Sequence, residues 1–179
     1  MTLAREPDAV VAELLAAAAR AIPAPVAGSR IAGVGWATVE LERAAADFGA
    51  ALDLPPDAWT PADRDQLLGA AALLGPPLGP DARGPRLVLL EPDTEGRLAA
   101  SLARHGEGVA AVYVVEPLTE GVVPAPAAIG ASRGGAARSS VAPGPLGRAR
   151  LVLGGPIPGP HVVVLDAPPN PESLPSPGD

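Results

Sequence analysis

The chain has 179 residues, of which 47% are apolar and 18% charged, so it is long enough for one domain with a real core and too apolar for intrinsic disorder. Its net charge of −7 argues against a nucleic-acid partner, because phosphate binding needs clustered basic side chains and the 13 basic residues here are scattered arginines. The lack of cysteine excludes disulfides and thiolate metal sites.

The sequence shows no signal for export or for membrane insertion. Charged residues precede the first apolar stretch, and no uninterrupted apolar run is long enough for a membrane span. We therefore expect a cytoplasmic protein without a membrane partner.

The first expected element is a helix at residues 7–21, where apolar side chains recur at helical spacing and Pro7 and Asp8 suit the first turn. It belongs to an N-terminal helical extension over residues 1–25. We expect this helix to pack over the surface of the main domain. A partner-binding or dimer helix is the alternative.

The main domain is expected over residues 26–167. Apolar runs favour strands, and apolar residues at helical spacing next to capping or stop residues favour helices. The stretch 57–84 is ambiguous, because its apolar run at 67–74 fits either a helix or a strand, and we favour the strand. The expected elements are a strand at 30–39, a helix that opens at Glu40 and ends before Pro55, the strand at 67–74, a strand at 86–90, a helix at 95–104 capped by Thr94 and stopped by Gly106, and strands at 109–115, 150–153 and 162–165.

Two stretches are not expected to form regular structure. Residues 117–147 are rich in Pro, Gly, Ala and Ser with little periodicity, so we expect an irregular connection. Residues 168–179 are rich in proline, and we expect a disordered tail.

Two segments carry a family resemblance. The first is RIAGVGWATV at 30–39 with the helix that follows it, and the second is LVLLEP at 87–92, then a helix, then RHGEGVAAVYV at 104–114. Together they resemble methylmalonyl-CoA epimerase and its glyoxalase relatives, which form the vicinal oxygen chelate superfamily. The closing RLVLGGPIPGPHVVVLD at 150–166 resembles the last two strands of a second module of that family.

The resemblance implies an α+β fold in which paired βαβββ modules form a cup-shaped mixed sheet. The second module is expected to be degenerate, because no helix for it is evident within 117–147. A homodimer is an open alternative, for which the helix at 7–21 is the candidate contact.

The family holds a divalent metal with side chains on the inner strands of the cup. Carried over position by position, those ligands fall on Gly33, Val88, Ala110 or Ala111, and Val163. None of these side chains can donate an electron pair, so the resemblance implies a chain without the metal site, and we expect no other cofactor.

Strand alternation assigns further residues to the inner face of the cup. Their mostly small, apolar character predicts a site for a small hydrophobic molecule. Tyr113 and His161 are the candidate catalytic residues, as a general acid and a general base; a core tyrosine and a surface histidine are the alternatives. Glu91 and Glu107 are expected to make structural hydrogen bonds, and His105 to suit a helix end. The expected ligand-binding residues are Gly33, Gly35, Arg86, Val88, Leu90, Ala111 and Val163.

Two functions from different classes stay open. The first is a metal-independent isomerase, cyclase or lyase that acts on a small hydrophobic carbonyl compound, with natural-product biosynthesis as a setting suggested by analogy. The alternative is a non-catalytic protein of the same fold that binds, sequesters or gives resistance to a small molecule. An inert paralogue that works only with a partner is a third reading. Convergence of Tyr113 and His161 in a pocket favours the enzyme, and a wholly apolar cup favours the binder.

Overall fold

The computed structural model describes residues 6–93, 95–116, 137–153 and 159–166. The tail expected at 168–179 and most of the connection expected at 117–147 lie outside these residues. The helices are α1 (Pro7–Ala21), α2 (Leu41–Leu52) and α3 (Arg97–His105), with short 3-10 turns at Ala24–Val26 and Pro56–Ala58. The strands are β1 (Arg30–Ala37), β2 (Thr60–Asp65), β3 (Ala70–Pro77), β4 (Arg86–Pro92), β5 (Gly108–Val115), β6 (Ala142–Gly144), β7 (Gly147–Leu151) and β8 (His161–Leu165).

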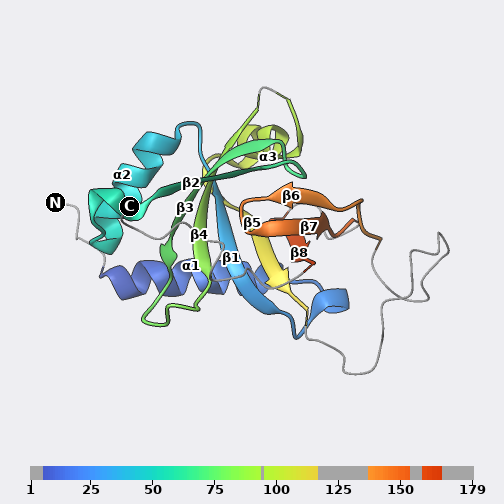
Figure 1. Ribbon diagram of the computed structural model, residues 1–179, viewed down its shortest axis with the longest axis horizontal. Coiled ribbons are helices and arrows are strands. Elements are labelled where there is room, and N and C mark those ends of the chain that lie inside the picture. Colours follow the sequence, from blue (N-terminus) through green and yellow to red (C-terminus); the bar gives the residue numbers. More distant parts are fainter. Residues whose placement is uncertain (1–5, 94, 117–136, 154–158, 167–179) are drawn as a thin grey trace.

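These strands form one mixed sheet in the order β2-β3-β4-β1-β5-β8-β7-β6 (Figure 1). β1 pairs parallel with β4, β5 pairs parallel with β8, and β1 and β5 meet antiparallel at the centre. The order is therefore symmetric about the β1–β5 pair, as two modules of four strands require. The two edges approach each other, since the backbone N–H of Gln66 donates to the carbonyl of Pro143 over 3.3 Å. The predicted α+β fold with a cup-shaped mixed sheet is confirmed.

The central residues of β4, β5 and β8 are mainly Val, Leu and Ala because both faces of these strands are buried there. Alternate side chains separate into two clusters. The inner cluster lines the cup and includes Val88, Leu90, Ala111, Tyr113, Val163 and Leu165. The outer cluster lies under the helices and includes Leu87, Leu89, Val112, Val114, Val162 and Val164.

Helices α1 and α2 cover the outer face of the sheet. Leu14 and Ala18 of α1 are buried in the outer cluster with the valines of β5 and β8. In α2, Ala44 is buried, and Phe48 meets Trp36 of β1 edge to face with ring centroids 5.1 Å apart. The predicted helix at 7–21 is confirmed, and it packs over the domain as expected.

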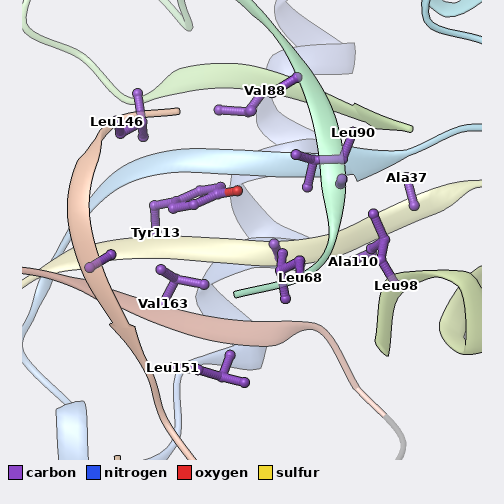
Figure 2. Packing of buried hydrophobic residues seen from close by; sticks show 14 of the residues in the cluster. Ala37, Leu68, Val88, Leu90, Leu98, Ala110, Tyr113, Leu146, Leu151 and Val163 are labelled. Carbon is purple, nitrogen blue, oxygen red and sulfur yellow. The ribbon is translucent and has the colours of Figure 1, made fainter. Parts of the chain in front are cut away.

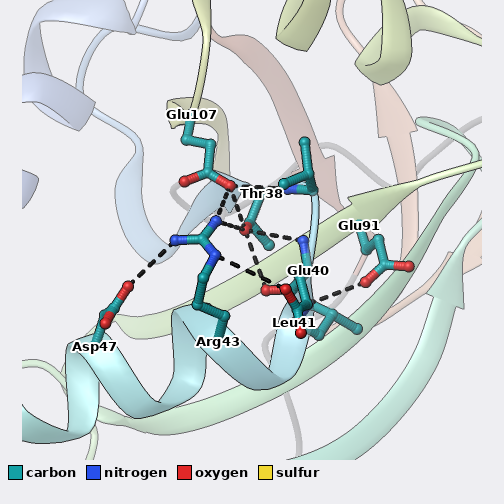
Figure 3. Close-up of polar contacts among 8 residues, drawn as sticks. Thr38, Glu40, Leu41, Arg43, Asp47, Glu91 and Glu107 are labelled. Atoms are coloured by element: carbon teal, nitrogen blue, oxygen red, sulfur yellow. Dashed lines mark hydrogen bonds and ion pairs between the residues drawn. The ribbon is translucent and has the colours of Figure 1, made fainter.

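The glutamates of the two family motifs fix the junction between β1 and α2 (Figure 3). Glu107 accepts hydrogen bonds from the Thr38 hydroxyl at 2.7 Å and the Val39 N–H at 2.9 Å, and it also binds Arg43. Glu91 accepts from the Leu41 N–H at 3.0 Å and so satisfies a free donor at the start of α2. The expectation of structural hydrogen bonds at both glutamates is confirmed.

Three element predictions need correction. The helix expected at 95–104 begins at Arg97, after Gly96 with φ of 145°, so the predicted start is wrong; Thr94 itself lies outside the described residues. The strand expected at 67–74 begins at Ala70, because residues 66–69 form a turn around Asp65. The prediction of an irregular connection over 117–147 is wrong at its C-terminal end. There β6 and β7 pair in an antiparallel hairpin, with Gly147 at φ of 113°.

In the part of the chain that the structure describes, none of the helices combines the length and the apolar character that crossing a membrane would take.

Candidate functional site

The positions expected to correspond to metal ligands lie on four neighbouring strands of the inner face. Gly35 of β1 is in register with Val88 of β4 and with Ala111 of β5. Tyr113 of β5 is in register with Gly33 on one side and Val163 on the other. The backbone therefore brings Gly33, Val88, Ala111 and Val163 together inside the cup.

The cup is filled by the chain's own side chains (Figure 2). Val88, Leu90, Ala111 and Val163 have 0% of their surface exposed. A Cβ atom added at Gly33 would lie 2.6 Å from Cδ1 of Leu146, and one added at Gly35 would lie 2.7 Å from Cβ of Ala111. The expected ligand-binding residues thus contact other parts of the protein rather than open space. Their role toward a ligand stays a prediction.

Arg86 differs from the other expected lining residues because it is polar and half-buried. Its Nε donates to the carbonyl of Gly75 over 2.8 Å, and burial lowers the pKa of its guanidinium. This side chain therefore has a partner on the neighbouring strand β3.

The main polar feature of the cup is a buried pair formed by Tyr113 and Asp65. The Tyr113 hydroxyl donates to Oδ2 of Asp65 over 2.7 Å, and each residue is 1% exposed. Oδ1 of Asp65 accepts from the N–H groups of Leu67 and Leu68, both at 3.0 Å. Burial raises the pKa of the Asp65 carboxyl against the effect of these hydrogen bonds, and burial followed by the charge of Asp65 raises the pKa of Tyr113 well above its usual range. The pair is satisfied within the protein.

A pocket of about 620 Å³ opens at the edge of the second module. Its lining residues come from the C-terminal end of α1, one face of α3, the end of β7 and the beginning of β8. Its lining comprises Ala17, Arg20, Ala21, Pro23, Arg97, Ala100, Ser101, Arg104, His105, Val109, Leu151, Val152, Leu153, Gly159, Pro160, His161 and Val162.

His161 is half-buried and lines this pocket. Burial and then the charge of Arg97 lower the pKa of its imidazole, opposed by the backbone of Arg97 and the charge of Asp65. The neutral imidazole is therefore favoured near pH 7. His105, the last residue of α3, lines the same pocket, next to the helix end that suits a cation.

The two candidate catalytic residues lie on adjacent strands but do not face the same open space. His161 is in register with Ala111, two residues before Tyr113, so both belong to the inner face of adjacent strands. Tyr113 is sealed inside the cup with its hydroxyl bound to Asp65, whereas His161 lies at the pocket. The charge of Asp65 acts on both residues. It contributes to the raised pKa of Tyr113, and it partly offsets the lowering of the pKa of His161. A catalytic role for either residue stays a prediction.

Comparison with solved structures identifies the fold. Methylmalonyl-CoA epimerase from Mycobacterium tuberculosis is similar with a TM-score of 0.54 and 16% identity, over 87% of this chain and 97% of that one. The fold is that of the vicinal oxygen chelate superfamily. A hypothetical protein from Bacillus halodurans is also similar, with a TM-score of 0.51 and 13% identity, over 76% of this chain and 93% of that one. No family model and no curated protein matches the sequence.

The residues of the cup do not fit the divalent metal that the resemblance implies. Gly33, Val88, Ala111 and Val163, the positions expected to correspond to the ligands, carry hydrogen or hydrocarbon side chains, which donate no electron pair. Asp65 is a carboxylate inside the cup, but both of its oxygens already accept hydrogen bonds. Among the described residues, no group of three or more His, Asp or Glu side chains is placed to hold a metal ion.

Two features of the site escaped sequence reasoning. Asp65 stands in a polar stretch that resembles a surface turn, and its partner Tyr113 is 48 residues away. The pocket joins segments that are remote in the chain, so no local pattern marks it. The one available signal was that Arg97 and Arg104 stand seven residues apart, which places both on one face of a helix.

Proposed function

We propose that this protein binds a small molecule without a metal, in the pocket between α1, α3 and β8. The observation that carries the proposal is the contrast between a cup filled by the chain's own side chains and an open volume of about 620 Å³ beside it. A volume of this size suits a metabolite, because ligand pockets range over roughly 300–1,000 Å³. The expected homodimer and the cytoplasmic location stay predictions.

Binding is favoured over catalysis because of the state of Tyr113. A general acid must reach the ligand, and the Tyr113 hydroxyl is buried and already donates to Asp65. The wall of the pocket offers Ala, Val, Leu and Pro side chains with a few polar groups, which is the usual composition of a binding site.

A metal-independent isomerase, cyclase or lyase is the second candidate, and one observation favours it. The pKa of His161 is lowered, so its neutral imidazole is available near pH 7 as a general base at the pocket. In this reading His161 alone moves the proton, without Tyr113.

The test is a thermal-shift screen of hydrophobic carbonyl compounds and organic anions against the wild type and two variants of α3. Ser101 is half-buried and lines the pocket, so Ser101→Trp should fill it; Ala103 is exposed and does not line it, so Ala103→Trp is the matched control. Compounds that stabilise the wild type should stabilise Ala103→Trp and not Ser101→Trp.

Ligands that keep their effect on Ser101→Trp would show that the binding site lies elsewhere. Mass spectrometry of each ligand after incubation separates the two candidates. Conversion by the wild type that His161→Gln abolishes would favour the enzyme, and an unchanged ligand favours the binding protein.

A further inference from the structure

Three of the thirteen arginines of this acidic chain lie around one pocket. The net charge is −7, yet Arg20, Arg97 and Arg104 all line the pocket. Both histidines of the chain, His105 and His161, line it too. No Asp or Glu is among its described lining residues.

In the part of the chain that the structure describes, these three arginines have no carboxylate partner, as is also the case for Arg30, Arg83, Arg86 and Arg148. Arg43, Arg64, Arg138 and Arg150 each form an ion pair. Within the described ranges no ion pair joins an acidic side chain to the pocket arginines. Like charges that share a pocket repel one another, and an anion placed between them would remove that repulsion.

Helix α3 presents its basic residues along one face. Arg97, Ala100, Ser101 and Arg104 are spaced by three or four residues and all line the pocket, whereas Leu98 is buried in the inner cluster. Arg97 and Arg104 are seven residues apart, about 10 Å along the helix axis. A ligand that lies along this face can meet both guanidinium groups, and Arg97 is near enough to His161 for its charge to act on the imidazole.

The rest of the pocket is apolar. Leu151 ends β7 and Leu153 follows it, Val109 belongs to β5, and Pro160 and Val162 flank His161. The site therefore combines a basic wall with a hydrocarbon surface, and a ligand that fits it needs an anionic group and an apolar body.

We propose that the pocket binds a small organic oxyanion, an apolar body that carries a phosphate or carboxylate group, through Arg97 and Arg104 of α3 and Arg20 of α1. This inference rests on the proposed binding function and names the ligand class of the same site. Guanidinium groups suit it because their planar donors match phosphate and carboxylate oxygens in pairs.

Calorimetric titration with four probes tests the inference: naphthyl phosphate, naphthoic acid, naphthol and inorganic phosphate. We expect both organic anions to bind and naphthol to bind at least roughly tenfold more weakly, since charge-assisted hydrogen bonds separate them. The stronger of the two anions identifies phosphate or carboxylate as the preferred group. Added salt should weaken the binding of the anions.

Three variants assign the contacts. Arg97→Gln and Arg104→Gln should each weaken the better anion by roughly tenfold or more, while leaving the melting temperature unchanged. Arg83→Gln is the matched control, because Arg83 is an exposed arginine between β3 and β4, away from the pocket. Binding to Arg83→Gln should equal binding to the wild type.

The outcomes separate this inference from the proposed function. Naphthol that binds as tightly as the anions, and loses binding in Ser101→Trp, would overturn the anion site and leave a neutral small-molecule site. Inorganic phosphate that binds as tightly as naphthyl phosphate would overturn the need for an apolar body. Failure of all four probes, or equal affinity in Arg97→Gln and Arg83→Gln, would also overturn the inference. The proposed function fails separately, if Ser101→Trp keeps every ligand found in the screen.

Discussion

Polar groups have protein partners in the cup of this protein, whereas in its pocket several charged groups have no carboxylate partner among the described residues. In the cup, the Tyr113 hydroxyl and the Asp65 carboxylate satisfy each other at 2.7 Å and are almost wholly buried. In the pocket, Arg97 and Arg104 face an open volume, and the described residues give them no carboxylate partner. The difference teaches that a buried polar pair with complete hydrogen bonding belongs to the structure, whereas arginines beside a pocket without a carboxylate partner keep their donors available for a ligand.

The largest expected effect tests whether the cup is fully packed, by adding side-chain volume to it. Gly35→Ala places a Cβ atom 2.7 Å from Cβ of Ala111 and 2.9 Å from Cδ1 of Leu90. We expect a loss of about 3 kcal/mol in the free energy of unfolding, measured by urea denaturation, because the packed cup cannot take the extra methyl group. The control is Gly49→Ala in α2, where nothing lies within 4 Å of an added Cβ and the helix should gain about 0.5–1 kcal/mol. A neutral Gly35→Ala would mean that the cup has room for a ligand.

The next effect concerns the buried pair. Tyr113→Phe removes the donor to Oδ2 of Asp65 and leaves a buried carboxylate oxygen without it. We expect a loss of about 2 kcal/mol in the free energy of unfolding and no change in the affinity for the best naphthyl anion. If Tyr113→Phe kept the wild-type stability but bound the anion more weakly, Tyr113 would belong to the ligand site.

A smaller effect is expected at the β1–α2 junction. Hydrogen bonds from the Val39 N–H and the Thr38 hydroxyl, in that order, lower the pKa of Glu107. A lowered folded-state pKa contributes stability above the ordinary glutamate pKa, and that stability is lost as the pH falls through the lowered value. Glu107→Gln should therefore cost about 1 kcal/mol at pH 7, and the difference from wild type should shrink in acid. Glu42→Gln, at an exposed position of α2, is the control; an equal loss there would remove the structural role of Glu107.

The smallest expected effect is that of metal. The ligand positions of the cup carry no donor atoms, so a chelator or added zinc should leave the melting temperature unchanged. Parallel elemental analysis checks for a stoichiometric divalent ion. A metal-dependent shift would mean that the assignment of Gly33, Val88, Ala111 and Val163 to the ligand positions is misaligned.

The sequence predicted the centre of the sheet, β4, β1, β5 and β8, because local and motif signals agreed there, whereas β2 and β6 near its edges were not predicted. The runs at β4, β5 and β8 are apolar enough to mark buried strands, and Glu91 and Glu107 stand in motifs whose hydrogen bonds hold β1 to α2. Strand alternation then placed the inner positions correctly, since its period of two leaves little freedom.

The pocket could not be predicted in the same way. Its walls come from residues 17–23, 97–109 and 151–162, and only the packing of α1 and α3 around the sheet brings them together. Each of its arginines, taken alone, resembles a solvated surface residue. The turn at 66–69 escaped for a related reason. Its local hydrogen bonds to Asp65 depend on a carboxylate that a tyrosine from a distant strand holds in place.

The tight contact at Gly33 restricts which residues this strand can accept. A side chain could enter the cup from position 33 only if Leu146 were smaller, since even a Cβ atom would stand 2.6 Å from its Cδ1. Engineering a donor side chain such as an imidazole at this position would therefore need two coupled changes, one in each module. The first of them, a smaller residue at position 146, would leave a void and cost stability before the second could add a new function.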